Sequence, residues 1–133
     1  MKNNKTEFTR HAYELTEVLD AVMHFKIIEN SPDKILPEVL KLNSKVCNAK
    51  NQRPEFTLIF KDKTGWGKEL AVNPSASKPN IYHTSRVING KKSLLVLKVD
   101  INTKLLFIDV FNGFYPDNPG LSIEAIGMHP YYL

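Results

Sequence analysis

The stretch IYHTSRVINGKKSLLVLKVDINTKLLFIDVF, residues 81–111, decides the fold expected from this sequence. It holds three apolar or alternating segments of strand length, residues 81–88, 93–101 and 104–111. Asn89-Gly90 separates the first two and favours a tight hairpin, because both residues tolerate a positive φ. Asn102-Thr103 marks a second tight turn. The stretch therefore predicts an antiparallel meander.

The sequence upstream of residue 54 shows a different period. Apolar residues recur at helical spacing in its first part, at Phe8, Ala12, Leu15, Leu19 and Val22. This spacing predicts a helix within residues 6–28. After the break at residues 30–33, Val39, Leu40 and Leu42 predict a second helix within residues 32–48. From residue 54 onward, Phe56, Leu58 and Phe60 alternate with other residues and predict a strand.

Helices followed by tightly connected strands predict an α+β fold for residues 1–133, taken as a single domain. Two N-terminal helices are expected to pack on a four- to five-stranded, mostly antiparallel β-meander. A last short strand is expected at residues 121–126. The segments 93–101 and 104–111 are apolar on both faces. If the helices cover only one face, the other is a candidate homodimer interface.

Composition narrows the class of protein. The chain is 42% hydrophobic and 24% charged, which is typical of globular domains. Its single cysteine, Cys47, excludes a disulfide within the chain and favours a reducing compartment. No apolar stretch has the length of a signal peptide or a membrane span. We therefore expect a cytoplasmic protein with no membrane partner.

Positive charge is concentrated in the middle of the chain. Residues 54–104 hold nine Lys/Arg against four Asp/Glu, a balance of +5, whereas residues 105–133 hold none against three. A balance of this sign attracts polyanions, and RNA is the partner considered first. Lys91, Lys92 and Lys98 are the candidate phosphate contacts. The alternative is a solvated, lysine-rich face with no ligand.

Ile81 to Arg86 is the segment most suggestive of chemistry. His83 can exchange a proton near neutral pH, and Arg86 can hold a phosphate through two parallel hydrogen bonds. Tyr82 and Ser85 are candidate substrate contacts beside them. On a strand, however, His83 and Ser85 face one side while Tyr82 and Arg86 face the other. The alternative is a half-exposed strand with one hydrogen-bonded histidine.

The remaining candidates are isolated. His129 could fold back beside His83 as a second proton-transfer group, and Tyr131 could stack on a base. The four histidines have no metal-ligand spacing, so neither a metal nor another cofactor is expected. Trp66 lies between Gly65 and Gly67, where it is either an exposed binding aromatic or an anchor at the edge of the core.

The order of elements, together with His83 and Arg86, resembles the small ribonucleases of the barnase, EndoU, colicin-E5 and RelE-like type. The resemblance implies a toxin-type ribonuclease, encoded by a phage or another mobile element, that cuts RNA without metal. His83, Arg86 and His129 would be its catalytic residues. The competing hypothesis is a non-catalytic interaction module, such as an immunity protein, a phage-encoded inhibitor or a small dimer. Its support is the acidic, aromatic C-terminal third, which suits a basic protein partner.

Overall fold

The computed structural model describes residues 8–28, 35–45, 55–75, 80–100, 102–117 and 119. This part of the chain forms one antiparallel sheet that closes on itself as a barrel. Its strands are β1 (Thr9–Leu19), β2 (Val22–Ile27), β3 (Val39–Lys45), β4 (Glu55–Asp62), β5 (Gly65–Trp66), β6 (Leu70–Pro74), β7 (Ile81–Ile88), β8 (Lys91–Asp100) and β9 (Leu105–Phe111).

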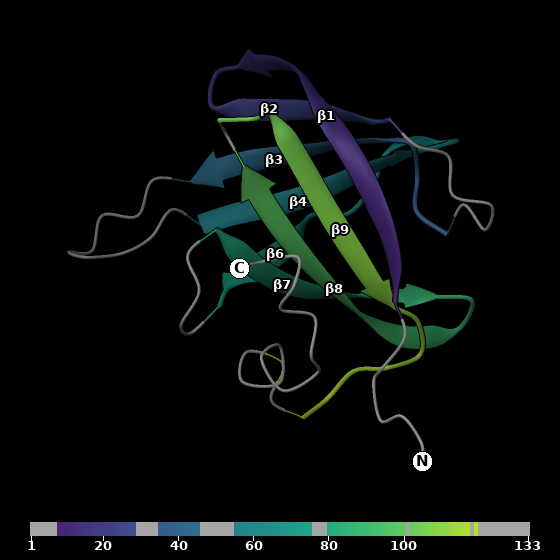
Figure 1. Ribbon diagram of the computed structural model, residues 1–133. Helices are drawn as coiled ribbons and strands as arrows, with labels where there is room; N and C mark the ends of the chain where they lie inside the picture. Colours follow the sequence, from purple (N-terminus) through teal and green to yellow (C-terminus); the bar gives the residue numbers. More distant parts are fainter. Residues whose placement is uncertain are drawn as a thin grey trace.

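Two strand pairings close the barrel. One joins strands far apart in the sequence, and the other joins the two ends of the hydrogen-bonded row of strands. The first strand, β1, pairs with β9, and β3 pairs with β4 across the loop between them. Eight strands form the closed wall, and the short β5 continues the line of β6 along β4. Figure 1 shows β1, β9 and β8 running diagonally in front of β3 and β4, so the wall has a front and a back layer.

The expected α+β fold is wrong, because residues 9–27 form the β1–β2 hairpin instead of a helix. Register explains the error. His11, Tyr13 and Leu15 face the interior at alternate positions, and a bulge between Leu15 and Glu17 then shifts the alternation. The helical spacing mixes the two faces of β1, because Phe8 and Ala12 lie on its outer face and Leu15 on its inner face. Leu19 and Val22 pair with each other at the hairpin end. Leu19, counted above on a helical stripe, is 55% exposed.

The second expected helix is also wrong. Residues 39–45 form β3, in which Leu40 and Leu42 face inward and are fully buried. Leu40 and Leu42, two positions apart, fit the period of a strand, but Val39 beside them obscured the alternation in so short a run. By contrast, the strands expected around residues 56–60, 81–88, 93–101 and 104–111 are confirmed. The strand expected at residues 121–126 lies outside the described residues.

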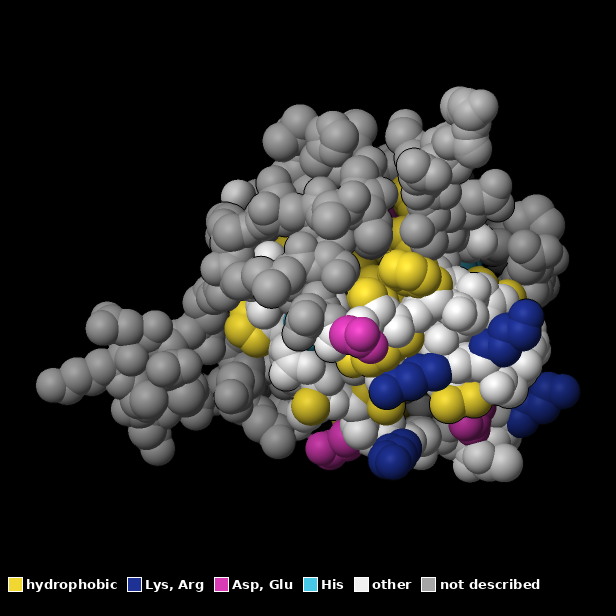
Figure 2. Space-filling view, turned by 90° about the horizontal axis from the view of Figure 1, so that it is seen from below, with side chains coloured by type: hydrophobic (Ala, Val, Ile, Leu, Met, Phe, Trp, Pro, Cys, Tyr) yellow, Lys and Arg dark blue, Asp and Glu magenta, His cyan; other side chains and the backbone are white. Residues whose placement is uncertain are grey.

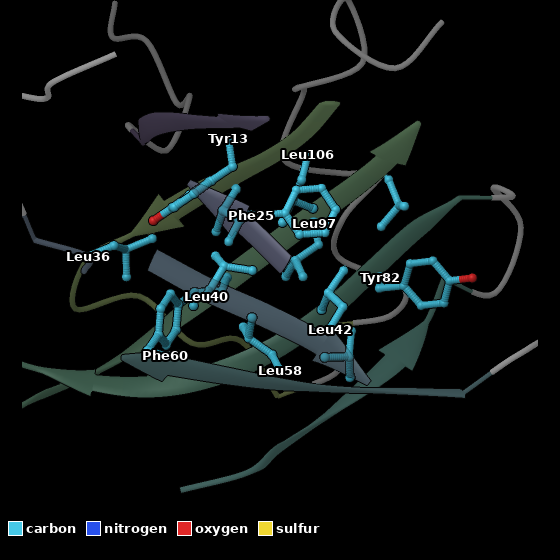
Figure 3. Packing of buried hydrophobic residues seen from close by; sticks show 14 of the residues in the cluster. Tyr13, Phe25, Leu36, Leu40, Leu42, Leu58, Phe60, Tyr82, Leu97 and Leu106 are labelled. Atoms are coloured by element: carbon cyan, nitrogen blue, oxygen red, sulfur yellow. The ribbon is translucent and has the colours of Figure 1, made fainter. Parts of the chain in front are cut away.

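The inward-facing side chains fill the barrel. The core unites Tyr13 of β1, Phe25 of β2, Leu58 of β4 and Leu97 of β8 with many other leucines and aromatics, all less than a tenth exposed. Figure 3 shows these side chains converging from opposite walls, with Leu36 from the β2–β3 connection among them. An eight-stranded barrel has an interior just wide enough for side chains to fill. In the described part of the chain, side chains fill the middle of this barrel, and the two hollows described below lie toward its surface.

A second apolar cluster covers part of the outside wall. Ile81, Leu94, Val96 and Phe111 are buried there, with Phe8, Phe114 and Tyr115 packed against them. Both apolar faces of β8 are thus buried, and within the described residues no helix contributes to this burial. Side chains of the same chain occupy the face considered above for a homodimer. No helix in the described ranges is long and apolar enough to cross a membrane.

Candidate functional site

The pocket singled out here lies where the barrel wall is least continuous. Among the described residues, β6 pairs with β7 only at Asn73–His83 and Pro74–Tyr82, although β7 continues to Ile88. On the other side, the strand line along β4 is interrupted between β5 and β6 at residues 67–69. These two breaks leave a hollow of about 180 Å³ lined by Phe60, Asp62, Gly67, Lys68, Leu70 and Arg86, named here the Arg86 pocket.

Arg86 is the central group of the Arg86 pocket. It pairs in register with Ser93 on the interior face of β7, and its guanidinium carbon lies 4.4 Å from the centroid of the Phe60 ring. The side chain is half-buried, and this burial lowers the pKa of Arg86 from its ordinary value. No hydrogen-bond acceptor for Arg86 is found within the described ranges. A desolvated guanidinium with unused donors is suited to receive an anion.

Asp62 balances part of this charge from the end of β4. Its Oδ1 accepts hydrogen bonds from the Thr64 hydroxyl at 2.7 Å and the Thr64 backbone N–H at 3.0 Å. These bonds, the side-chain one first, lower the pKa of Asp62, so the group is ionised at neutral pH. With Arg86 and the exposed Lys68, the lining carries two cations and one carboxylate. The pocket is therefore net positive.

A second hollow adjoins the Arg86 pocket and shares Asp62 with it. It measures about 490 Å³ and is lined by Pro37, Glu38, Val39, Lys61, Asp62 and Lys63. Tyr13 fixes this region from inside the barrel, because its hydroxyl donates to the Pro37 carbonyl at 2.7 Å. Burial raises the pKa of Tyr13, so its phenol stays neutral and remains a donor.

The structure does not bring His83 and Arg86 together. His83 pairs with Val96 on the outer face of β7, whereas Arg86 faces the interior, as strand alternation predicts. His83 is 9% exposed, and burial lowers its pKa. Its Nδ1 has no hydrogen-bond partner among the described residues. The barrel wall thus separates the expected base from the expected phosphate-binding group.

The other expected contacts are also dispersed. Tyr82 is buried inside, with its ring 5.1 Å from that of Phe56, while Ser85 faces outward beside Leu94. Lys91 and Lys92 are exposed at the start of β8, where the Lys92 Nζ lies 4.2 Å from the Tyr115 ring centroid. Lys98 is half-buried further along the same strand. His129 and Tyr131 lie outside the described residues.

Three residues of the Arg86 pocket were not singled out in the sequence: Phe60, Asp62 and Lys68. Phe60 was correctly assigned to a strand. Its convergence with Asp62 and Lys68 on Arg86 depends on closure of the barrel, which no local pattern in the sequence indicates.

Basic side chains on the face seen in Figure 2 do not form a continuous band. Lys and Arg are interspersed there with hydrophobic and acidic side chains. Comparison with known proteins adds no relative: no family model, curated protein or solved structure matches this chain.

Proposed function

We propose that this protein is a non-catalytic binding module whose Arg86 pocket takes an anionic group, a carboxylate or a phosphate, from a ligand or partner. The observation that carries the proposal is the half-buried Arg86 guanidinium, stacked on Phe60 and without a hydrogen-bond acceptor in the described part of the chain. Ligand sites are typically concave and mostly apolar, with a few polar groups held in place, and the Arg86 pocket has this character.

The energetics of Arg86 favour an external anion. Burial has removed part of the water around the guanidinium, and the carboxylate of Asp62 is already held by Thr64. An incoming carboxylate or phosphate can accept two parallel hydrogen bonds from the planar guanidinium of Arg86. A single water molecule cannot accept both bonds in this geometry. The ring of Phe60 holds the Arg86 guanidinium in position, so less side-chain entropy is lost on binding.

The size of the pocket limits what it can hold. At about 180 Å³ it is smaller than the roughly 300–1,000 Å³ of sites that enclose a whole ligand. It suits the charged end of a larger molecule. The adjoining hollow at Lys61 and Lys63 offers room for the rest of that molecule.

Binding without catalysis is favoured over the ribonuclease hypothesis by the position of His83. Metal-independent RNA cleavage needs a proton-transfer group within hydrogen-bond reach of the phosphate held by the cation. His83 and Arg86 face opposite sides of β7. The ribonuclease hypothesis stays a prediction, which an RNA cleavage assay in the presence of EDTA would test.

Anion-dependent thermal unfolding tests the proposed function. Inorganic phosphate and acetate serve as probes for the two headgroups, with chloride at equal ionic strength as the reference. The wild-type Tm should rise with one or both probes. Arg86→Met should weaken binding roughly 10- to 150-fold, the usual worth of hydrogen bonds to a charged group. Arg86→Lys should bind the anions with intermediate affinity, because lysine keeps the positive charge but cannot donate two parallel hydrogen bonds.

Lys104→Asn is the matched control. It removes one positive charge in the turn between β8 and β9, and asparagine tolerates the left-handed backbone of Lys104, whose φ is 62°. This variant should respond to the probes as the wild type does. Equal responses from Arg86→Met and the wild type would refute the proposal, and so would a wild type indifferent to both anions.

A further inference from the structure

The outer wall of β2 to β5 carries an aromatic and basic surface distinct from the Arg86 pocket. Lys61 on β4 pairs with Trp66 on β5 and with Val39 on β3, and Lys41 on β3 pairs with His24 on β2. Residues paired in register point to the same side of a sheet. The side chains of His24, Lys26, Lys41, Lys61 and Trp66 therefore share the outside of the barrel, and together they are named the Trp66 surface.

Trp66 is the centre of the Trp66 surface. Its side chain is 41% exposed, which is unusual for so large an apolar group. The Nζ of Lys41 lies 4.3 Å from the indole centroid and that of Lys61 lies 5.9 Å away. His24 meets the indole edge-on at 6.0 Å between centroids and 77° between planes. An exposed ring is thus bordered by three basic side chains.

No carboxylate lies among the residues nearest to Trp66 in the register. These neighbours are Val39, Lys41, Ile59 and Lys61. Glu14 and Glu17 lie beyond its border on β1, opposite Lys26 and His24. Val39 and Ile59 fill the positions between the basic residues in the register. The surface thus combines positive charge with apolar area.

We propose that the Trp66 surface binds a single strand of nucleic acid, with a base stacked on the indole and phosphates held by Lys41 and Lys61. Proteins that bind single strands combine a positive surface with exposed aromatic rings in this way. A polyanion without bases would use the lysines alone and would leave the exposed indole unused. RNA and DNA share the required chemistry, and the experiment distinguishes them. The proposal does not depend on the Arg86 pocket.

Trp66 is the sole tryptophan of the chain, so its own fluorescence reports the proposed contact. We would titrate the protein at low salt with single-stranded oligouridylate and oligothymidylate of equal length. Stacking should quench the fluorescence with one or both. Inorganic polyphosphate, which has no bases, should bind more weakly and leave the fluorescence nearly unchanged. The ratio of the two oligonucleotide affinities shows whether the 2′-hydroxyl contributes.

Variants separate stacking from charge, with anisotropy of a labelled oligonucleotide as the readout. Trp66→Ala should weaken binding roughly 5- to 150-fold, the worth of one base stacked on an aromatic ring. Trp66→Phe should recover most of the loss, because it restores a ring. Replacing Lys41 and Lys61 together by Gln should reduce the slope of log K against log salt by about 1.4, or about 0.7 for each phosphate contact.

The control is the double variant in which Lys91 and Lys92 are both replaced by Gln. It removes the same number of positive charges as the Lys41 and Lys61 variant. These exposed lysines lie on β8, away from Trp66, and their loss should change affinity much less than loss of Lys41 and Lys61. Three results would overturn the proposal: no quenching by either oligonucleotide, equal affinity for polyphosphate, or a larger effect of the Lys91 and Lys92 pair. An unchanged Tm of each variant would show that a loss of binding is not a loss of folding.

Discussion

His83 is a histidine placed where its charged form is unfavourable. It lies on the outer face of β7 with only 9% of its area exposed, and its register partners are Val96 on β8 and Asn73 on β6. No charged residue stands opposite it in either pairing. Burial therefore lowers its pKa without compensation from a counter-charge. The imidazole is neutral at neutral pH, which suits a structural residue.

The depressed pKa of His83 predicts a loss of stability on acidification. Between pH 7 and about 5 the unfolded chain, in which a histidine has a pKa of about 6.5, takes up the proton more readily than the folded chain. The free energy of unfolding should therefore fall as the pH drops through this range. His83→Leu should make the dependence less steep, as measured by urea unfolding at several pH values.

Ser85→Ala serves as the control, because it changes a non-titrating residue on the same face of β7. It should keep the wild-type slope of stability against pH. Parallel slopes for His83→Leu and the wild type would show that His83 is protonated equally in the folded and unfolded chains. His83 would then not be the source of the acid sensitivity.

At the scale of elements, two hairpins with the same geometry differ in how readily the sequence reveals them. Asn89 and Gly90 join β7 to β8 with φ values of 53° and 78°, and this dipeptide is a recognised hairpin signal. Asp20 and Ala21 join β1 to β2 with φ values of 50° and 66°. Aspartate tolerates a positive φ, but alanine rarely adopts one, so Ala21 hid the turn in the sequence.

The unusual backbone at Ala21 predicts a stabilising substitution. Ala21→Gly should raise the free energy of unfolding by roughly 0.5–1 kcal/mol, because glycine adopts a positive φ without the clash that Cβ causes. Ala71→Gly is the matched control in the extended backbone of β6, where glycine should cost roughly 0.5–1 kcal/mol. Urea unfolding measures both. A loss of stability in both variants would contradict the argument.

The sequence predicted the second half of the barrel much better than the first. Residues 81–111 carry long apolar strands and a strong turn signal, so local pattern and final structure agree. In β1 the bulge and the alanine turn disguised the alternation. For the candidate site, the sequence singled out Arg86 as a residue that could hold a phosphate. Its neighbours Phe60 and Lys68 were not singled out, because they meet it only after β4, β6 and β7 are assembled.

At the scale of the whole molecule, one ion pair links the first described strand of the barrel, β1, to the last, β9. Nε and a terminal nitrogen of Arg10 on β1 donate to the two carboxylate oxygens of Asp109 on β9, each at 2.7 Å. Asp109 is fully buried, and the Arg10 guanidinium also lies 5.1 Å from the Phe107 ring centroid. Two parallel bonds fix the orientation of the strands as well as their contact.

Loss of Arg10 should therefore weaken the closed barrel strongly. Arg10→Met leaves the buried Asp109 carboxylate without its guanidinium, and breaking a buried pair in this way costs roughly 3–5 kcal/mol. The double variant Arg10→Met, Asp109→Leu should recover much of the loss, because no charge remains buried. Lys26→Met, an exposed change on β2, should stay within about 0.5 kcal/mol of the wild type. A single Arg10→Met variant as stable as the wild type would refute this role.

The pairing of β1 with β9 has a consequence for synthesis of the chain on the ribosome. Arg10 and Asp109 are separated by 99 positions, so β1 is made long before its partner. At roughly 5–20 residues per second, translation needs about 5–20 s to cover that distance. The strands in between can form hairpins as they emerge, but one edge of β1 has no partner during this interval. That edge is a template for pairing with other nascent chains, and it stays available until β9 has been made.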